Sequence, residues 1–184
     1  MRVIAGEKRH LSLKTLDNLS IRPTTDKIKE TLFNMIQFEL TGQNFLDLYA
    51  GSGAIGIEAL SRGSNIATFV DNNREAINVI NYNLDRTKLK DRSFVYQKDV
   101  VNFLQNNLDT HVYHIVFLDP PYEGNLYKNT LLAISKSSLI DDNSIIIAES
   151  NIKENFDYVK DIGLSIIKVK EYKNNKHVFF KKDK

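Results

Sequence analysis

The sequence predicts a single α/β domain built on a mainly parallel, doubly wound sheet. Short apolar segments alternate with longer segments whose apolar residues recur at helical spacing, which is the pattern of repeated strand–helix units. One apolar segment, Ile115–Leu118, contains no polar residue, as expected of a strand buried on both faces of a parallel sheet. The chain has 184 residues, of which 42% are hydrophobic, and this is enough for one domain with a complete core.

The N-terminal segment lies outside this alternation. Two strand-like pieces, Val3–Ala5 and Leu11–Leu13, flank a basic turn and predict a small hairpin. We therefore treat residues 1–22 as a basic hairpin extension and residues 23–184 as the main domain.

A lead-in helix is predicted next. It begins at Thr24 or Thr25, either of which can cap its N-terminus, and Gly42 ends it. We expect the phenylalanines of this region, Phe33, Phe38 and Phe45, to be core aromatics.

The central part of the chain predicts five strands and the helices between them. The apolar segments typical of strands are Phe45–Tyr49, Ile66–Val70, Phe94–Tyr96, Ile115–Leu118 and Ile145–Ala148. The helical segments are Ala54–Arg62, Arg74–Arg86, Val101–Leu108 and Leu126–Ser135, with a short helical turn at Phe156–Val159. Strands connected by helices pair in parallel with right-handed crossovers.

The C-terminal end breaks the alternation. Leu164–Val169 and His177–Phe180 are joined by a short polar segment without a helix, so they predict an antiparallel hairpin. The whole sheet is then expected to contain seven strands.

A glycine-rich turn follows the first strand of the alternation. The glycines Gly51, Gly53 and Gly56 have the spacing of the dinucleotide fingerprint, and they let a ligand approach the backbone at a helix N-terminus. Asp71 follows at the end of the second strand, where a carboxylate accepts hydrogen bonds from ribose hydroxyls. This pattern fits a nicotinamide cofactor or S-adenosylmethionine.

Two further carboxylates favour S-adenosylmethionine. Asp47 lies inside the first strand, where its charge suits a cationic methionine group and repels a pyrophosphate. Asp99, between Lys98 and Val100, follows the third strand and is placed to meet an adenine edge. The alternative for Asp47 is a buried acid bonded to loop amides.

The tetrapeptide Asp119-Pro120-Pro121-Tyr122 ends the fourth strand. Consecutive prolines cannot donate to a sheet, so the strand stops at its carboxyl end, where ligands bind in open α/β sheets. A carboxylate, backbone carbonyls and an aromatic ring meet there, and they suit the amino group of a planar, base-like substrate. The alternative is a strand end whose tyrosine caps the core.

The charge distribution is uneven. Residues 1–22 carry five basic and two acidic residues, residues 168–184 carry seven lysines and two acidic residues, and the remainder has a net charge of −6. Basic ends suggest an anionic partner such as nucleic acid, although solvated lysine-rich termini explain the charge equally well.

Several classes of protein are excluded or disfavoured. The absence of cysteine excludes disulfides and zinc–thiolate sites, and His111 and His114 have no partners at metal-ligand spacing. No apolar segment is long enough to cross a membrane, and the first residues lack the apolar core of a signal peptide. We expect a cytoplasmic protein without a metal.

The combined motifs resemble a known family. Segment 47–53, Asp71, Asp99 and segment 119–122 resemble class I methyltransferases that modify exocyclic amino groups. Four further segments make the sequence similar to the bacterial RsmD family: Ala5-Gly6 with Arg9, Arg22–Asn34, Gly56–Gly63 and Phe117–Tyr122. The sequence departs from the family pattern at His10-Leu11, where Gly-Arg is usual, and near Asn175-Lys176, where a glycine is common.

This resemblance implies methyl transfer from S-adenosylmethionine to the N2 amine of one guanine in small-subunit (16S) ribosomal RNA, by a monomeric enzyme with a Rossmann-like fold. Asp119, Pro120, Pro121 and Tyr122 would form the catalytic corner. The cofactor residues would be Asp47, Gly51, Ser52, Gly53, Asp71, Asn72, Asp99 and Val100. RNA or the small ribosomal subunit would contact Arg2, Lys8, Arg9, Arg22 and Thr24. Methylation of adenine or of a glutamine side chain, and a non-catalytic RNA-binding module, remain alternatives.

Overall fold

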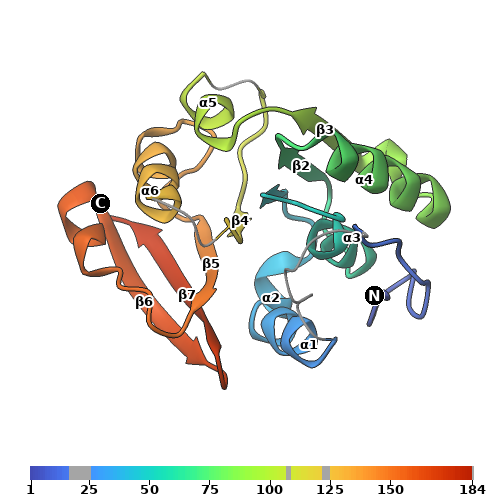
Figure 1. The fold of residues 1–184 in the computed structure, drawn as a ribbon, viewed down its shortest axis with the longest axis horizontal. Coiled ribbons are helices and arrows are strands. Elements are labelled where there is room, and N and C mark those ends of the chain that lie inside the picture. The colour runs from blue at the N-terminus through green and yellow to red at the C-terminus, as the bar shows by residue number, and fades with distance from the viewer. Residues whose placement is uncertain (17–25, 107–108, 122–124, 184) are drawn as a thin grey trace.

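A computed structural model describes residues 1–16, 26–106, 109–121 and 125–183. Within them one seven-stranded sheet has the order β3-β2-β1-β4-β5-β7-β6 (Figure 1). The strands are β1 (Phe45–Leu48), β2 (Ala67–Asp71), β3 (Ser93–Gln97), β4 (Ile115–Leu118), β5 (Ile145–Asn151), β6 (Leu164–Glu171) and β7 (Asn175–Lys182). Strands β1 to β5 pair in parallel, whereas β7 is antiparallel to both β5 and β6. The predicted mainly parallel sheet with an antiparallel C-terminal hairpin is confirmed.

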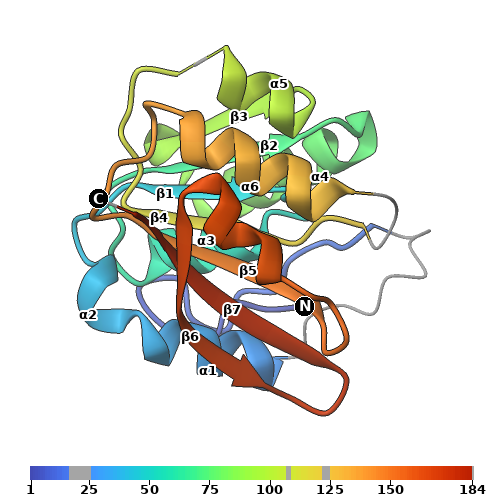
Figure 2. The ribbon, with the colours of Figure 1, turned by 90° about the vertical axis from the view of Figure 1, so that its left-hand side faces the viewer.

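Helices cover both faces of the sheet. Figure 2 shows α5 and α6 on one side of it and α1 and α2 on the other. The helices are α1 (Asp26–Met35), α2 (Gln37–Leu40), α3 (Ala54–Ser61), α4 (Arg74–Thr87), α5 (Val100–Gln105) and α6 (Leu126–Lys136), with 3-10 helices η1 (Lys90–Arg92) and η2 (Asp157–Ile162). No described helix has the length and apolar character of a membrane span.

The two faces hold separate apolar cores, because successive side chains of a strand point to opposite faces. Leu46 and Leu48 of β1 belong to the core beneath α5 and α6, whereas Phe45 belongs to the core beneath α1 and α3. Asp47 therefore shares the face of Phe45. The same alternation assigns Asp119, just after β4, and Glu149, within β5, to faces, and this decides which polar groups meet at the site.

The lead-in helix differs from the prediction. It is divided into α1 and α2 at Ile36, whose φ of −119° and ψ of 11° are not helical. The residues that face the core are Phe33, Ile36 and Leu40, so Phe38 points away and is 90% exposed. The expectation that Phe38 is a core aromatic is wrong, and the predicted N-caps Thr24 and Thr25 lie outside the described residues.

The N-terminal segment pairs with itself as an antiparallel hairpin. Val3 N–H donates to the Leu11 carbonyl at 2.9 Å, and His10 N–H donates to the Val3 carbonyl at the same distance. Regular strand pairing is limited to one bridge between Arg2 and Ser12. The predicted domain boundary at residue 22 lies outside the described residues.

A buried carboxylate holds this segment on α3. Glu58 is fully buried and accepts hydrogen bonds from Ile4 N–H at 2.8 Å and Ala5 N–H at 3.0 Å. Its charge is balanced by two cations, Lys29 Nζ at 3.2 Å and Arg62 Nε at 2.7 Å. Because one carboxylate serves four donors from three segments, the N-terminal segment is fixed to the main domain at this point.

Candidate methyl-transfer site

The loop after β1 has an unusual backbone. Tyr49, Gly51 and Gly53 all have positive φ, at 58°, 55° and 74°. Tyr49 is not a glycine, and this conformation costs a side-chain-bearing residue free energy, which is typical of functional loops. The Tyr49 hydroxyl and the Thr130 hydroxyl of α6 lie 2.7 Å apart, which anchors the loop to the helix. The turn brings the chain directly into α3, so the free N–H groups of that helix face the carboxyl edge of the sheet.

Asp47 lies beneath this loop and is 2% exposed. Its Oδ2 accepts a hydrogen bond from Gly56 N–H at 2.9 Å. Burial raises the pKa of the Asp47 carboxyl to about 8, the Gly56 hydrogen bond opposes this shift, and the charge of Asp71 adds to it. A cation placed nearby would offset the burial and ionise the acid. The hydrogen bond from the Gly56 amide agrees with the alternative that Asp47 is a buried acid bonded to loop amides. The raised pKa of Asp47 suits a cationic ligand.

Asp71 lies at the end of β2 and bridges two loops. Its carboxylate accepts from Gly51 N–H and from Asn73 N–H, both at 2.9 Å. Each carboxylate oxygen has a second lone pair, so ribose hydroxyls can still bind. Asn72, in the turn between Asp71 and Asn73, is exposed.

Asp99 is the third acidic residue predicted to bind the cofactor, and it lies after β3. Its side chain caps α5 by accepting from Asn102 N–H at 2.8 Å, and it remains exposed. Val100, the first residue of α5, is buried beside it. The predicted cofactor residues thus lie at the carboxyl ends of β1, β2 and β3 or just after them, with Ser52 between the two glycines of the first loop.

The corner after β4 contains Asp119, half-buried, then Pro120, buried, and Pro121, exposed. Burial raises the pKa of the Asp119 carboxyl well above its usual range, and the charges of Glu149 and Asp47 raise it further. The predicted stacking residue Tyr122 lies outside the described residues.

Strand register explains why these acids interact. Asp47 of β1 pairs with Phe117 of β4, and Phe117 precedes Asp119 by two residues on the same face. Leu118 pairs with Ala148 of β5, so Asp119, just after β4, and Glu149, within β5, lie on adjacent strands at the same level. Three carboxylates therefore gather on one face at the carboxyl edge of the sheet.

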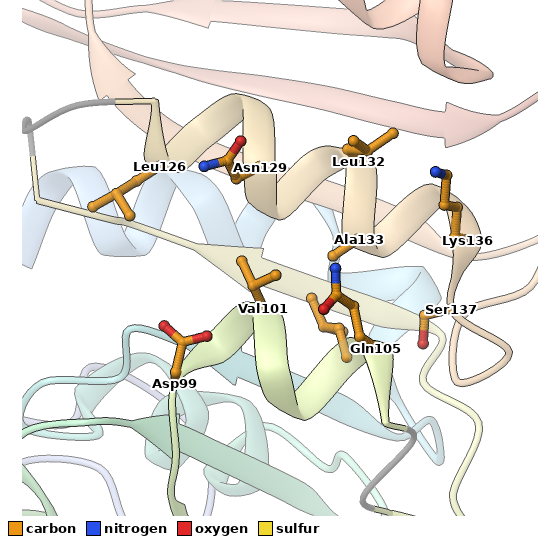
Figure 3. Close-up of a pocket in the computed structure, with 10 residues that line it drawn as sticks. Asp99, Val101, Gln105, Leu126, Asn129, Leu132, Ala133, Lys136 and Ser137 are labelled. Carbon is orange, nitrogen blue, oxygen red and sulfur yellow. The ribbon is translucent and has the colours of Figure 1, made fainter.

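A cavity of about 570 Å³ lies between α5 and α6, with Asp99 at one end and Lys136 and Ser137 at the other (Figure 3). Val101 and Gln105 of α5 and Leu126 of α6 point into it. The cavity shares Asp99 with the predicted adenine edge, so one end of it lies at that edge. The sequence analysis did not anticipate it, because it depends on how two helices pack.

The predicted RNA-contacting residues have different environments. Arg9 is exposed, whereas the Arg2 Nε lies 2.9 Å from Asp26 Oδ2 in a surface ion pair. Lys8 is half-buried and its Nζ lies 3.8 Å from a Glu7 carboxylate oxygen. Arg22 and Thr24 lie outside the described residues. Arg9 is therefore better placed than Arg2 for an external phosphate.

Sequence reasoning missed two polar residues of the site, Glu149 and His177. Glu149 follows the apolar run of β5 directly, in the position that Asp119 occupies after β4, and this repetition is the signal that could have identified it. His177 gives no comparable signal. The described residues contain no group of three or more potential ligands that could hold a metal ion.

These features define a class of protein. The strand order, with β7 reversed between β5 and β6, and the acids at the carboxyl ends of β2 and β4 are those of a Rossmann-like methyltransferase fold. A solved structure from Escherichia coli, "Putative methyltransferase yhhF", superposes with a TM-score of 0.86 at 30% identity and covers 100% of this chain and 98% of its own.

The family follows from the sequence match. The model of the family "Conserved hypothetical protein 95" matches residues 1–181, so the chain belongs to this family. "Ribosomal RNA small subunit methyltransferase D" of Haemophilus influenzae is 30% identical, covering 95% of this chain and 94% of its own. "Putative rRNA methyltransferase YlbH" of Bacillus subtilis is 41% identical, covering 81% and 82%. The predicted resemblance to the RsmD family is confirmed.

Proposed function

We propose that this protein transfers a methyl group from S-adenosylmethionine to the exocyclic N2 amine of a guanine in small-subunit ribosomal RNA. It acts in the cytoplasm as a monomer. The observation that carries the proposal is the placement of Asp119 and Pro120 on the sheet edge that also holds Asp47 and Asp71. Relatives named for methylation of small-subunit ribosomal RNA support the substrate class.

The donor set fits S-adenosylmethionine. Asp47 is buried with a pKa of about 8 and receives a hydrogen bond from one amide, so it gains most from a cationic group. Asp71 offers acceptors to ribose hydroxyls, and Asp99 offers one to the adenine amine. When bound, S-adenosylmethionine supplies an electrophilic methyl group on a cationic sulfur.

Asp119 and the Pro120 carbonyl act on the amine. The N2 lone pair of guanine is delocalised into the ring, so the amine is a poor nucleophile. Acceptors for its two N–H protons favour a more tetrahedral nitrogen, whose lone pair then points at the methyl group. This is catalysis by positioning and by matching of the charge that develops.

Methylation of the RNA tests the proposal. We expect purified protein with labelled S-adenosylmethionine to methylate 16S RNA or small subunits, and nuclease digestion with mass spectrometry to identify N2-methylguanine. N6-methyladenine would replace the guanine assignment by the adenine alternative. RNA binding without any transfer would support the non-catalytic module instead.

A variant pair assigns the chemistry to the corner. Asp119→Ala should fold and bind S-adenosylmethionine but lose at least about a hundredfold in transfer rate, since it removes an acceptor for the amine. Asp91→Ala, in the exposed η1 segment, is the matched control and should keep the rate. Normal turnover by Asp119→Ala would remove the corner from the mechanism.

A further inference from the structure

A chain of hydrogen bonds runs from the carboxyl end of β5 into the C-terminal hairpin. Glu149 pairs with His177 across the antiparallel strands β5 and β7, and Glu149 Oε2 lies 3.2 Å from His177 Nε2. The other carboxylate oxygen accepts from Asn175 Nδ2 at 2.7 Å. His177 Nδ1 lies 3.0 Å from the Tyr172 hydroxyl.

This arrangement fixes both the position and the chemistry of the Glu149 carboxylate. Glu149 is 5% exposed and His177 is fully buried. A neutral imidazole with its proton on Nε2 donates to Glu149 and accepts from the Tyr172 hydroxyl, so one tautomer satisfies both contacts. Asn175, where the family commonly has a glycine nearby, supplies the second donor. Two donors from the hairpin stabilise a negative charge at a buried place.

The charge lies beside the proposed catalytic acid. Asp119 and Glu149 follow the paired residues Leu118 and Ala148 on adjacent parallel strands. The ring of His177 packs edge-on against Phe117, with centroids 6.3 Å apart, on the same face of the sheet. Glu149 and Asp119 interact electrostatically, and the charge of Glu149 favours the protonated form of Asp119.

We propose that Glu149, held by Asn175 and by the His177–Tyr172 pair, is a positioning residue that makes Asp119 a stronger proton acceptor in methyl transfer. The proposal rests on the proposed function, because it concerns the same reaction. Asp119 contacts the amine, and Glu149 acts through Asp119 by its charge. The C-terminal hairpin is then part of the catalytic apparatus as well as of the sheet.

Methyl transfer breaks the methyl–sulfur bond, whose electron pair stays on sulfur, and the N2 lone pair forms the new nitrogen–carbon bond. The nitrogen becomes positively charged and loses one proton to the Asp119 carboxylate. A second negative charge beside Asp119 raises the affinity of Asp119 for that proton, because like charges disfavour two ionised acids.

Further polar and charged groups lie around the pair. Asp47 of β1 lies on the same face and also favours protonation of Asp119. From α6, the Tyr127 hydroxyl donates to the Glu149 backbone carbonyl at 2.8 Å. Lys176 Nζ is directed to the Glu154 carbonyl at 2.7 Å. Asp47 and Tyr172 are unchanged in Glu149→Gln, so a moved pH limb in that variant reports the lost charge of Glu149.

The pH dependence of the chemical step tests the proposal. We expect the single-turnover rate of the wild type to rise with pH as Asp119 ionises. In Glu149→Gln the rising limb should move to lower pH by about one unit, and the plateau should fall about tenfold because Asp119 is a weaker base. A purely structural role would change the amount of folded enzyme without moving the limb, so an unmoved limb overturns the proposal.

A second variant avoids the buried carboxylate, in case Glu149→Gln does not fold. Tyr172→Phe removes one hydroxyl at a half-buried position and releases His177 Nδ1. The limb should move in the same direction by a smaller amount. Tyr158→Phe is the matched control, since the Tyr158 hydroxyl is buried without a hydrogen-bond partner among the described residues. If the two tyrosine variants had equal pH–rate profiles, the hydrogen bonds from Tyr172 through His177 to Glu149 would have no role in the reaction.

A binding measurement separates this proposal from the proposed function. Calorimetry in buffers of different ionisation enthalpy counts the protons released when S-adenosylmethionine binds. A bound cation favours the ionised form of acids at this edge, so the pH at which the proton count is largest should move to lower pH in Glu149→Gln, whose neutral side chain no longer favours a proton on Asp119; an unmoved maximum overturns the inference. Failure of the wild type to methylate RNA would overturn the proposed function alone, since this count does not require turnover.

Discussion

The Asn83 side chain donates a hydrogen bond to the Ser52 carbonyl at 2.9 Å and so connects α4 to the loop after β1. The same fully buried side chain accepts from Lys14 N–H at 2.8 Å and donates to the Lys14 carbonyl at 3.0 Å. One residue therefore holds both the cofactor loop and the end of the N-terminal hairpin. These two regions are remote in the sequence.

Replacement of Asn83 should weaken both regions together. Asn83→Leu leaves three part-buried backbone groups without their partner, so we expect a loss of about 1–3 kcal/mol in the free energy of unfolding and weaker S-adenosylmethionine binding. Urea unfolding and calorimetry measure the two effects. Asn78→Leu, on the exposed side of α4, is the control and should change neither by more than about 0.5 kcal/mol. Equal stability of the two variants would contradict the proposed connection.

Cofactor affinity should depend on pH through Asp47. The folded protein without ligand holds a proton on this acid below about pH 8, and a bound cation favours the ionised form. Binding therefore releases a proton, and the affinity should increase from pH 6 to about pH 8 and then level off. Asp47→Asn should bind more weakly and with a smaller slope. An identical slope in calorimetry at several pH values would exclude Asp47 as its source.

The same pKa predicts a stability change of opposite sign. Folding raises the pKa of Asp47 from its ordinary value to about 8. At pH values between these two pKa values, the folded protein therefore binds more protons than the unfolded chain. Its contribution to the free energy of unfolding should fall as pH rises through this range. Without ligand, the Tm of Asp47→Asn minus the Tm of the wild type should accordingly be larger at pH 8 than at pH 5. A difference that stays constant with pH would contradict this assignment.

Gly6 should be required for the N-terminal segment to pack against α3. Its φ is +82°, and a Cβ atom there would lie 1.8 Å from the Ser61 carbonyl oxygen, which is backbone and cannot rotate away. Gly6→Ala should cost more than about 2 kcal/mol in unfolding free energy. Gly163→Ala is a matched control because φ is +76° and no atom lies within 4 Å, so it should cost about 1 kcal/mol. Similar losses in both variants would show that contact with Ser61 has no role.

RNA binding should depend on Arg9. This side chain is exposed, and a contact with one phosphate would release counterions on binding. Arg9→Glu should lower RNA affinity and reduce the slope of log K against log salt by roughly 0.7–0.9. Lys160→Glu, in the exposed part of η2, reverses the same charge at another surface and is the control. If filter binding at several salt concentrations gave equal slopes for both variants, Arg9 would make no phosphate contact.

Local sequence was sufficient to predict the strands and the loops that carry the site. The apolar run Ile115–Leu118 and the prolines after it predict a central strand and its end, because proline stops a ladder in any context. The glycines at 51 and 53 predict the turn in the same way, since few other residues adopt their backbone conformation. These signals are carried by adjacent residues, and no distant contact is needed to interpret them.

Tertiary structure decided the features that depend on pairing between distant segments. Phe38 belongs to an apolar pattern but is exposed, because Phe33, Ile36 and Leu40 already fill the buried side of the divided helix. The meeting of Glu149 with His177 depends on the register of β5 against β7, and a shift of one residue would turn one of them to the other face. The sequence alone determined which groups the protein can use for chemistry, and strand register decided which of them meet.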